Sequence, residues 1–199
     1  MLNEDETAIV KLLGGDLPLF LRNPRIGDII GELRRINEGT AARLQAIVDE
    51  HGWPGTSLVG RAGAQASFFL VTYLFTMPAF QRAMVPLLEK AVMAGEASGR
   101  HLARLEDGIR CMEGRLQKYG TALGWDENGE MSPYPSIEDP ENVDRMRAEI
   151  GLPSLRDALR MHEIALMKHR RRVPREELAK IRANTEEWAR VLGWRQKKP

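Results

Sequence analysis

The sequence is poor in the residues that build disulfide or metal-linked frameworks. Its 199 residues include one cysteine, Cys111, which excludes an internal disulfide and any multi-cysteine zinc or iron–sulfur site. The four histidines are scattered; His162 and Glu163 begin a zinc-protease pattern, but Leu166 stands where its second histidine belongs. We therefore predict no metal site and no cofactor.

Long apolar runs are also missing. The most apolar window, residues 68–77, would rise about 15 Å as a helix, roughly half of a bilayer's hydrocarbon core. The first six residues, MLNEDE, are acidic, whereas a secretory signal begins with basic residues followed by an apolar stretch. We expect a cytoplasmic protein with no membrane partner.

The chain as a whole has almost no excess of positive over negative charge, but one segment is strongly basic. The net charge is +1, which excludes a strong attraction of the whole molecule to nucleic acid or membrane. Residues 155–199 nevertheless carry 13 Lys and Arg against 6 Asp and Glu. The basic run 168–172, together with Arg175, Lys180 and Arg182, can form an anion-binding patch.

The basic segment leaves several interpretations open. It can bind an acidic partner or nucleic acid, or fold back on its own chain or on a neighbouring subunit. Nucleic acid is not favoured, because aromatic residues for base stacking are absent from the segment until Trp188. We favour the two interpretations in which the segment folds back, either on its own chain or on a neighbouring subunit; the second would give a homo-oligomer formed through the C-terminal helices.

Apolar residues recur at helical spacing along most of the chain. This predicts helices over 7–13, 24–48, 58–77, 78–92, 99–119, 142–150, 154–170 and 174–192, with a kink or break at Pro86. The Asn128-Gly129 turn and nearby prolines predict a small hairpin or irregular insertion near 120–140. The expected fold is a mostly α, single-domain helical bundle, divided into an N-terminal segment (1–40), a core (41–160) and a basic extension (161–199).

Polar residues are rare in the predicted helix 58–77. Gln65, Thr72 and Thr76 are spaced so that they share one face, and Tyr73 is adjacent. Such a stripe can line a solvated pocket, where Tyr73 would orient a ligand or act as an acid. The alternative, which we favour, is that the threonine hydroxyls bond to their own helix and Gln65 caps a neighbouring loop.

Asp107 lies opposite the apolar stripe of its predicted helix, on a face with small residues that let another helix approach. A carboxylate buried there needs hydrogen-bond or cationic partners. It would serve either as a general base or ligand anchor, or as a packing residue paired with Arg100, Arg104 or Arg110.

Two further groups can border a pocket. Gln117, Tyr119 and Thr121 surround Gly120, which we expect to end the helix in a left-handed conformation. They form either a pocket rim or a helix stop with Tyr119 packed inward. Trp53 is interpreted as a core anchor at a turn rather than as a stacking platform.

Four short motifs occur in a characteristic order: Gly52-Trp53-Pro54, Phe80-Gln81, Leu105-Glu106-Asp107 and Gln117-Lys118-Tyr119-Gly120-Thr121. Over residues 41–160 the chain thereby resembles a family of bacterial helical proteins catalogued as a domain of unknown function. The order and spacing of the motifs carry the resemblance, rather than any one motif.

The chain departs from that family at polar positions. Thr72-Tyr73 and Phe75 stand where relatives often have a Gln-His pair and an aspartate. Gly108 replaces an arginine, and Ala122 replaces a glutamine. If those residues form a catalytic site in relatives, the resemblance implies that this chain has lost much of it.

We arrive at three functional hypotheses. The first is a small-molecule-binding helical protein, which as an acid/base enzyme would be an isomerase, cyclase, lyase or hydrolase. Asp107 and Tyr73 would be catalytic, and the ligand would be held by Gln65, Thr72, Gln117, Tyr119, Thr121 and Trp53. The alternative is a non-catalytic interaction or assembly protein, and the third is a nucleic-acid-binding module.

Overall fold

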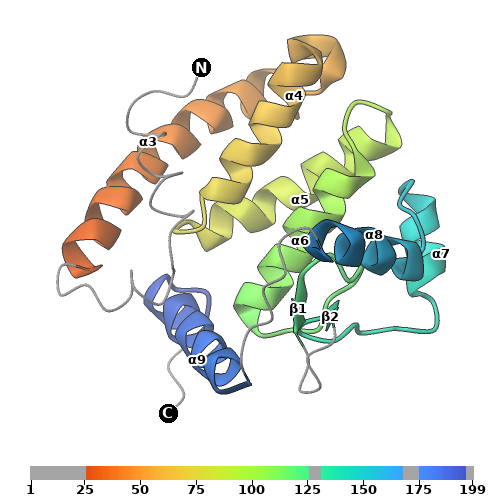
Figure 1. Cartoon of the computed structure of the whole chain (residues 1–199). Helices are drawn as coiled ribbons and strands as arrows, with labels where there is room; N and C mark the ends of the chain where they lie inside the picture. The colour runs from red at the N-terminus through yellow and green to blue at the C-terminus, as the bar shows by residue number, and fades with distance from the viewer. Residues whose placement is uncertain (1–25, 126–130, 168–174, 196–199) are drawn as a thin grey trace.

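Helices make up most of the chain, as the apolar spacing predicts (Figure 1). The computed structural model describes residues 26–125, 131–167 and 175–195. The described helices are α3 (Ile26–His51), α4 (Thr56–Tyr73), α5 (Pro78–Met93), α6 (Gly99–Glu113), α7 (Val143–Glu149), α8 (Leu155–Met167) and α9 (Arg175–Val191). The predicted mostly α fold class is confirmed.

Helices α3, α4 and α5 each pack against the next helix along the chain. Helix α9 then returns to α6, although some sixty residues separate them in the sequence (Figure 1). Helices α7 and α8 pack on each other, and α8 also contacts the second strand. The C-terminal end of α6 therefore lies close both to α9 and to residues 114–125, which follow it in the chain.

The insertion near 120–140 contains the predicted hairpin. Strand β1 (Leu123–Trp125) pairs antiparallel with β2 (Met131–Pro133), with Leu123 opposite Pro133. The Asn128-Gly129 turn lies outside the described residues. Since Tyr134 N also donates to Ala122 O at 3.0 Å, the pairing continues past the end of both strands.

The core forms where the inner face of α4 meets α5 and α6. Its most deeply buried apolar side chains are Phe68, Val71, Leu74, Met84, Leu88 and Leu102. Trp188, Leu192 and Trp194 from the C-terminal region join the same cluster. Of the alternatives for the basic extension, the structure thus shows α9 folded back on its own chain.

Loops hold the helix ends together across long sequence distances. The Glu96 carboxylate, in the α5–α6 loop, accepts hydrogen bonds from Ser57 N (2.7 Å) and Ser57 Oγ at the start of α4. At the start of α6, Gly99 approaches α7 so closely that a Cβ there would lie 1.8 Å from Ile150 O. Only glycine permits this approach.

Helix α6 is shorter than predicted. It ends at Glu113 rather than near Tyr119, because Gly114 adopts a left-handed conformation (φ 76°). Arg195 supports this earlier end by donating to the carbonyls of Cys111 (3.0 Å) and Met112 (2.9 Å). Gly120 is also left-handed (φ 68°), but within the loop that follows.

The expected interruption of a helix occurs elsewhere. Helix α5 runs through Pro86 as one element, and Pro86 is exposed, so the carbonyl that loses its partner is near solvent. The kink is in α4 at Gly60 (φ 70°, ψ 172°), a glycine at which we predicted no interruption. The predicted helix 7–13 and the basic run 168–172 lie outside the described residues.

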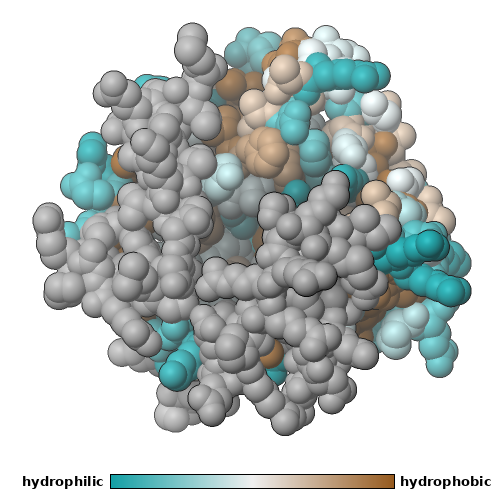
Figure 2. All heavy atoms as spheres, in the orientation of Figure 1, coloured by the Kyte–Doolittle hydropathy of each residue, from teal (hydrophilic) through white to brown (hydrophobic). Residues whose placement is uncertain are grey.

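The surface is mixed rather than uniformly polar. Figure 2 shows apolar side chains among polar ones in the upper part of the molecule, where α3 and α4 meet. Ile47, Leu58 and Val59 are among the large apolar residues with substantial exposure. Among the described helices, none is long and apolar enough to cross a membrane.

Candidate functional site

Asp107 is completely buried, and both of its oxygens bind the loop that follows α6. Oδ1 accepts hydrogen bonds from Lys118 N (2.8 Å) and Tyr119 N (3.0 Å). Oδ2 accepts from Thr121 N (2.8 Å) and Thr121 Oγ1 (2.8 Å). The carboxylate therefore fixes the 117–121 loop on the side of α6.

Gln117 is equally buried and connects the same loop to the hairpin. Its Oε1 accepts from Ala122 N (2.8 Å), and its Nε2 donates to Ala122 O (2.9 Å) and Pro135 O (2.6 Å). Its backbone N donates to Ser136 O (2.9 Å). Gln117 thus determines where the segments on either side of the hairpin lie.

Arg147 of α7 completes this buried polar region. Its Nη1 donates to Tyr119 O (2.6 Å) and its Nε to Pro153 O (2.7 Å). Burial lowers the pKa of Arg147, opposed by the negative charges of Asp144 and Asp107. Burial likewise raises the pKa of the Tyr119 phenol, so that it remains protonated near neutral pH.

The predicted packing partner of Asp107 was wrong. Backbone amides and one hydroxyl hold the carboxylate, not Arg100, Arg104 or Arg110. Arg110 instead pairs with Glu138 at 2.7 Å and, more distantly, with Glu106 at 3.5 Å. The sequence could not reveal these partners, since they depend on how the chain turns after Gly114.

The three residues of the predicted polar stripe have different surroundings. Thr76 lies beyond the end of α4 and is buried, and its Oγ1 accepts a hydrogen bond from Asn37 Nδ2 (2.8 Å). Thr72 is exposed, and its Oγ1 donates to Phe68 O (2.9 Å), one turn earlier in the same helix. Gln65 is exposed as well, while the Tyr73 ring is half-buried beside Phe69. For Thr72, the favoured interpretation of a hydroxyl bonded to its own helix is therefore confirmed.

Two residues of the family motifs, Trp53 and Gln81, are buried and contribute to the packing of the fold. Trp53 is 9% exposed and belongs to the apolar core. Gln81 is 5% exposed, and its Nε2 donates to Val71 O (2.8 Å) and Thr72 O (3.0 Å). Gln81 thereby supplies donors to two carbonyls at the end of α4.

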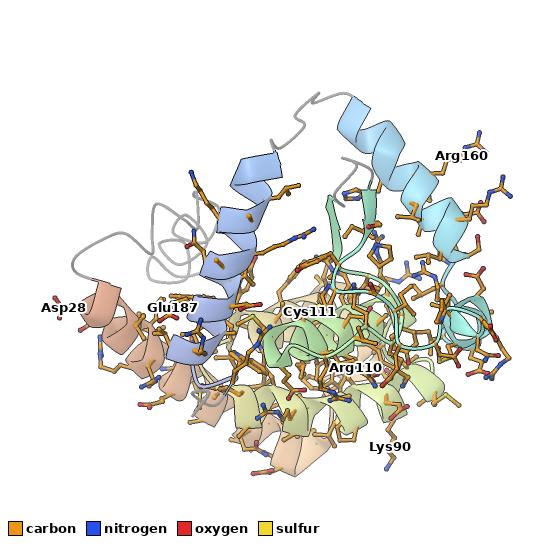
Figure 3. All side chains as sticks on the ribbon, turned by 90° about the horizontal axis from the view of Figure 1, so that it is seen from below. Asp28, Lys90, Arg110, Cys111, Arg160 and Glu187 are labelled. Carbon is orange, nitrogen blue, oxygen red and sulfur yellow. The ribbon has the colours of Figure 1, made fainter. Side chains whose placement is uncertain are left out.

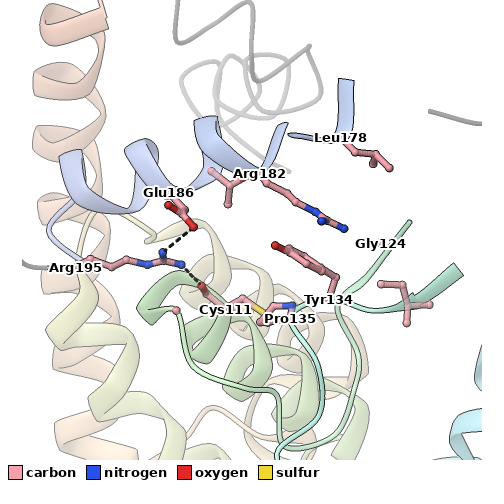
Figure 4. Close-up of a pocket in the computed structure, with 11 residues that line it drawn as sticks. Cys111, Gly124, Tyr134, Pro135, Leu178, Arg182, Glu186 and Arg195 are labelled. Carbon is pink, nitrogen blue, oxygen red and sulfur yellow. Dashed lines mark hydrogen bonds and ion pairs between the residues drawn. The ribbon is translucent and has the colours of Figure 1, made fainter. Parts of the chain in front are cut away.

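A cavity of about 420 Å³ lies between the end of α6, the hairpin and α9 (Figure 4). Cys111 and Gly114 line it from α6, Gly124 and Tyr134 from the hairpin region, and Leu178 from α9. None of the residues predicted as ligand contacts is among the described lining. We call this space the α6–α9 cavity.

Charged groups stand on the α9 side of this cavity. The Arg182 guanidinium lies 4.1 Å from the centre of the Tyr134 ring, a cation–π arrangement (Figure 4). Arg195 Nη1 lies 3.9 Å from the Glu186 carboxylate, beyond hydrogen-bonding distance. The Glu186 side chain is 60% exposed, so this ion pair is weak.

Cys111 contributes an inert thiol to the cavity wall. Figure 3 shows it near the middle of the molecule, beside α9, whereas Lys90 and Arg160 point outward. Burial, followed by the negative charge of Asp107, raises the pKa of Cys111 to about 12. The thiol therefore stays protonated at neutral pH and is a poor nucleophile.

Sequence reasoning missed most of the cavity wall. Arg182 was included in the predicted anion-binding patch, but Tyr134 and Arg195 were not singled out. Their neighbours along the chain give no signal, because the wall is assembled from three segments that meet only in the folded chain. The described residues contain no group of three His, Cys, Asp or Glu side chains suited to a metal ion.

The fold and the cavity together define a helical bundle with a partly open pocket whose lining includes two arginines. The chain belongs to a family of unknown function, DUF6624, whose model matches residues 21–169. This confirms the resemblance and extends it at both ends. No curated protein and no solved structure matches the chain significantly.

Proposed function

We propose that this protein binds a small organic molecule in the α6–α9 cavity. The observation that carries the proposal is the cavity itself, since about 420 Å³ falls within the 300–1,000 Å³ typical of ligand sites. Its wall combines apolar side chains such as Leu123 and Leu178 with a few polar groups. This composition is typical of small-molecule sites.

The buried polar residues support such a site without touching its ligand. Gln117 bonds to Ala122 and Pro135, and these flank Leu123, Gly124 and Tyr134 in the cavity wall. Asp107 in turn fixes the loop that carries Gln117. In this proposal Asp107 and Gln117 are positioning residues, which differs from the catalytic role that the sequence suggested for Asp107.

The chemistry of the cavity favours binding over acid–base turnover. The Cys111 thiol is protonated, the described lining contains no histidine, and its carboxylate, Glu186, is 60% exposed and faces Arg195. Both Asp107 oxygens already accept two hydrogen bonds, so neither is available as a base without breaking the loop. We therefore propose a binding protein rather than an isomerase, cyclase, lyase or hydrolase acting through Asp107.

The assembly hypothesis receives less support. Trp188, Leu192 and Trp194 of the C-terminal region are buried within the chain, which leaves Met161 (66% exposed) and Val191 (44% exposed) as single apolar side chains of α8 and α9 at the surface. The basic run 168–172, on which nucleic-acid binding would chiefly depend, lies outside the described residues. Neither hypothesis has an observation that favours it.

A cavity-blocking substitution tests the proposal. Leu178→Trp places a large ring in the cavity wall, and Ala179→Trp puts the same ring on an exposed neighbouring position as a control. A library of small metabolites is screened by thermal shift, and hits are measured by calorimetry. We expect hits that bind wild type and Ala179→Trp equally but bind Leu178→Trp at least tenfold more weakly. If no compound binds, or if the compounds that bind have the same affinity for both variants as for wild type, the proposal is contradicted.

A further inference from the structure

We propose that the outer half of α9, residues 178–187, is a lid that unwinds to admit the ligand of the α6–α9 cavity and rewinds over it. This inference rests on the proposed function and specifies how its site opens. A sharp boundary within α9 carries it, between residues that pack into the core and residues that line the cavity. The boundary falls between Glu187 and Trp188.

The C-terminal end of α9, together with the residues up to 195, is firmly anchored. Trp188 and Ala189 are 5% and 0% exposed, and Leu192 and Trp194, just beyond the helix, are also buried. Trp194 Nε1 donates to Phe75 O at 2.7 Å, which ties this end to the segment that follows α4. Unwinding here would expose side chains of the apolar core, so this end stays closed unless the whole fold opens.

The outer half of α9 differs in both respects. None of the described side chains in residues 178–187 is buried. Yet all the described residues by which helix α9 itself lines the cavity lie in this half: Leu178, Arg182, Thr185 and Glu186. Unwinding the outer half therefore removes one wall of the cavity and leaves the core intact.

The stability of the outer half depends on its contacts with the rest of the fold. A helix of this length is marginal in water by itself, so helices in proteins are held mainly by packed apolar faces. A segment without buried apolar side chains belongs to the part of a structure that opens locally while the remainder stays folded. In the closed state the Arg182 guanidinium lies 4.1 Å from the centre of the Tyr134 ring, which joins the outer half to the hairpin region. A ligand in contact with both Leu178 and Tyr134 would favour this closed arrangement.

Cys111 reports the position of the lid, because it is the one cysteine of the sequence and it lines the cavity. Figure 4 shows Leu178, Arg182 and Glu186 on the α9 side of the cavity and Cys111 across from them. With the lid closed the thiol is protonated and reacts slowly, and with the outer half unwound it meets solvent. The rate at which iodoacetamide labels Cys111 in the folded protein at pH 8 therefore measures how often the lid is open.

Ala183→Gly changes the lid without touching the cavity, and Ala46→Gly in α3 is its matched control. Both alanines are exposed and lie inside helices, and neither belongs to the described cavity wall. Glycine in place of alanine favours the unwound state of a helix about fivefold. We expect Ala183→Gly to raise the labelling rate of Cys111 about fivefold, and Ala46→Gly to leave it unchanged.

Amide hydrogen exchange gives an independent measurement. In the wild type, the amides of residues 182–187 should exchange about tenfold or more faster than those of Leu192 and Trp194, which belong to the anchored end. Equal protection in both regions would contradict the lid, as would equal labelling rates in wild type and Ala183→Gly. Equal acceleration by both glycine variants would contradict it too, because Cys111 would then be reached through global unfolding.

The lid and the proposed function can fail separately. If compounds bind wild type and not Leu178→Trp, but Ala183→Gly does not change the labelling rate, the cavity is a ligand site and the lid is wrong. If the lid exists, a compound that binds should protect Cys111 from iodoacetamide, because the bound ligand holds the outer half closed. If Ala183→Gly accelerates labelling but no compound binds, the proposed function fails, and the role of this motion in admitting a ligand fails with it.

Discussion

Replacing Asp107 by asparagine changes one atom in the most highly connected carboxylate of the described chain. In the wild type each oxygen accepts two hydrogen bonds, from Lys118 N and Tyr119 N on one side and from Thr121 on the other. The amide of asparagine retains one oxygen and presents an NH2 group in place of the second. That NH2 group cannot accept a hydrogen bond, so two donors lose their partner in either orientation.

The less costly orientation places the NH2 group toward Thr121. The Thr121 hydroxyl can rotate and accept from it, but Thr121 N remains buried without an acceptor. The two bonds to the remaining oxygen also lose their charge assistance. At about 1.5–3 kcal/mol per hydrogen bond to a charged group, and with one bond recovered, the free energy of unfolding should fall by about 3 kcal/mol. For a chain of this size the Tm should fall by about 6–12 °C.

Urea denaturation followed by circular dichroism measures this loss, with Asp49→Asn as the control. Asp49 is an exposed residue of α3 that accepts a hydrogen bond from Gln45, so its substitution should cost less than about 0.5 kcal/mol. Ligand binding by folded Asp107→Asn should persist. A stability equal to that of wild type, accompanied by loss of ligand binding, would refute the structural role and restore the catalytic one.

Other substitutions test separate parts of the structure. Burial and two nearby arginines lower the pKa of His101 below 6.5, so the unfolded chain takes up a proton on this residue before the folded chain does. The free energy of unfolding should therefore fall as the pH drops below about 6.5. In denaturation measured from pH 8 to 5, His101→Phe should flatten this slope. Gly99→Ala should lower the free energy of unfolding by at least about 3 kcal/mol, because the new Cβ would meet the backbone oxygen of Ile150 at the end of α7. Gly108→Ala, where a Cβ has no atom within 4 Å, should raise it by up to about 1 kcal/mol. Equal Tm values for the two variants would contradict the packing of α6 on α7. Iodoacetamide should modify Cys111 in the folded protein at pH 8 about a thousandfold more slowly than in the unfolded chain, and equal rates would show that the thiol is not buried as described.

Sequence periodicity located the helices because it records which side of each helix faces the core. The apolar stripe of α6, with Leu102, Leu105 and Ile109, is buried as its spacing indicated. Helix ends were less predictable. Gly114 and Gly120 are both left-handed, and the carbonyls at the end that the helix adopts are bound by Arg195, more than eighty residues away in the sequence.

In the candidate site, too, the residues could be found from the sequence but their contacts could not. The sequence singled out Asp107, Gln117 and Thr121 as candidate site residues, and the structure joins them through hydrogen bonds around the loop that follows α6. It could not show that their partners are backbone groups of the next loop, since a backbone amide has no sequence signature. The α6–α9 cavity was beyond sequence reasoning, because Tyr134 and Arg182 meet only after α9 returns to α6.

The sequence by itself determined the helical class, the place of the insertion and the family, because each depends on local spacing or on the order of short motifs. The tertiary structure alone decided what the buried polar residues bind and where a cavity opens. The physical reason is that hydrophobic periodicity acts over a few residues, whereas a cavity wall is assembled from segments distant in sequence. Gln117 illustrates both contributions. The sequence singled it out, and only the tertiary structure shows that its hydrogen bonds to Ala122 and Pro135 hold residues next to the cavity wall in place.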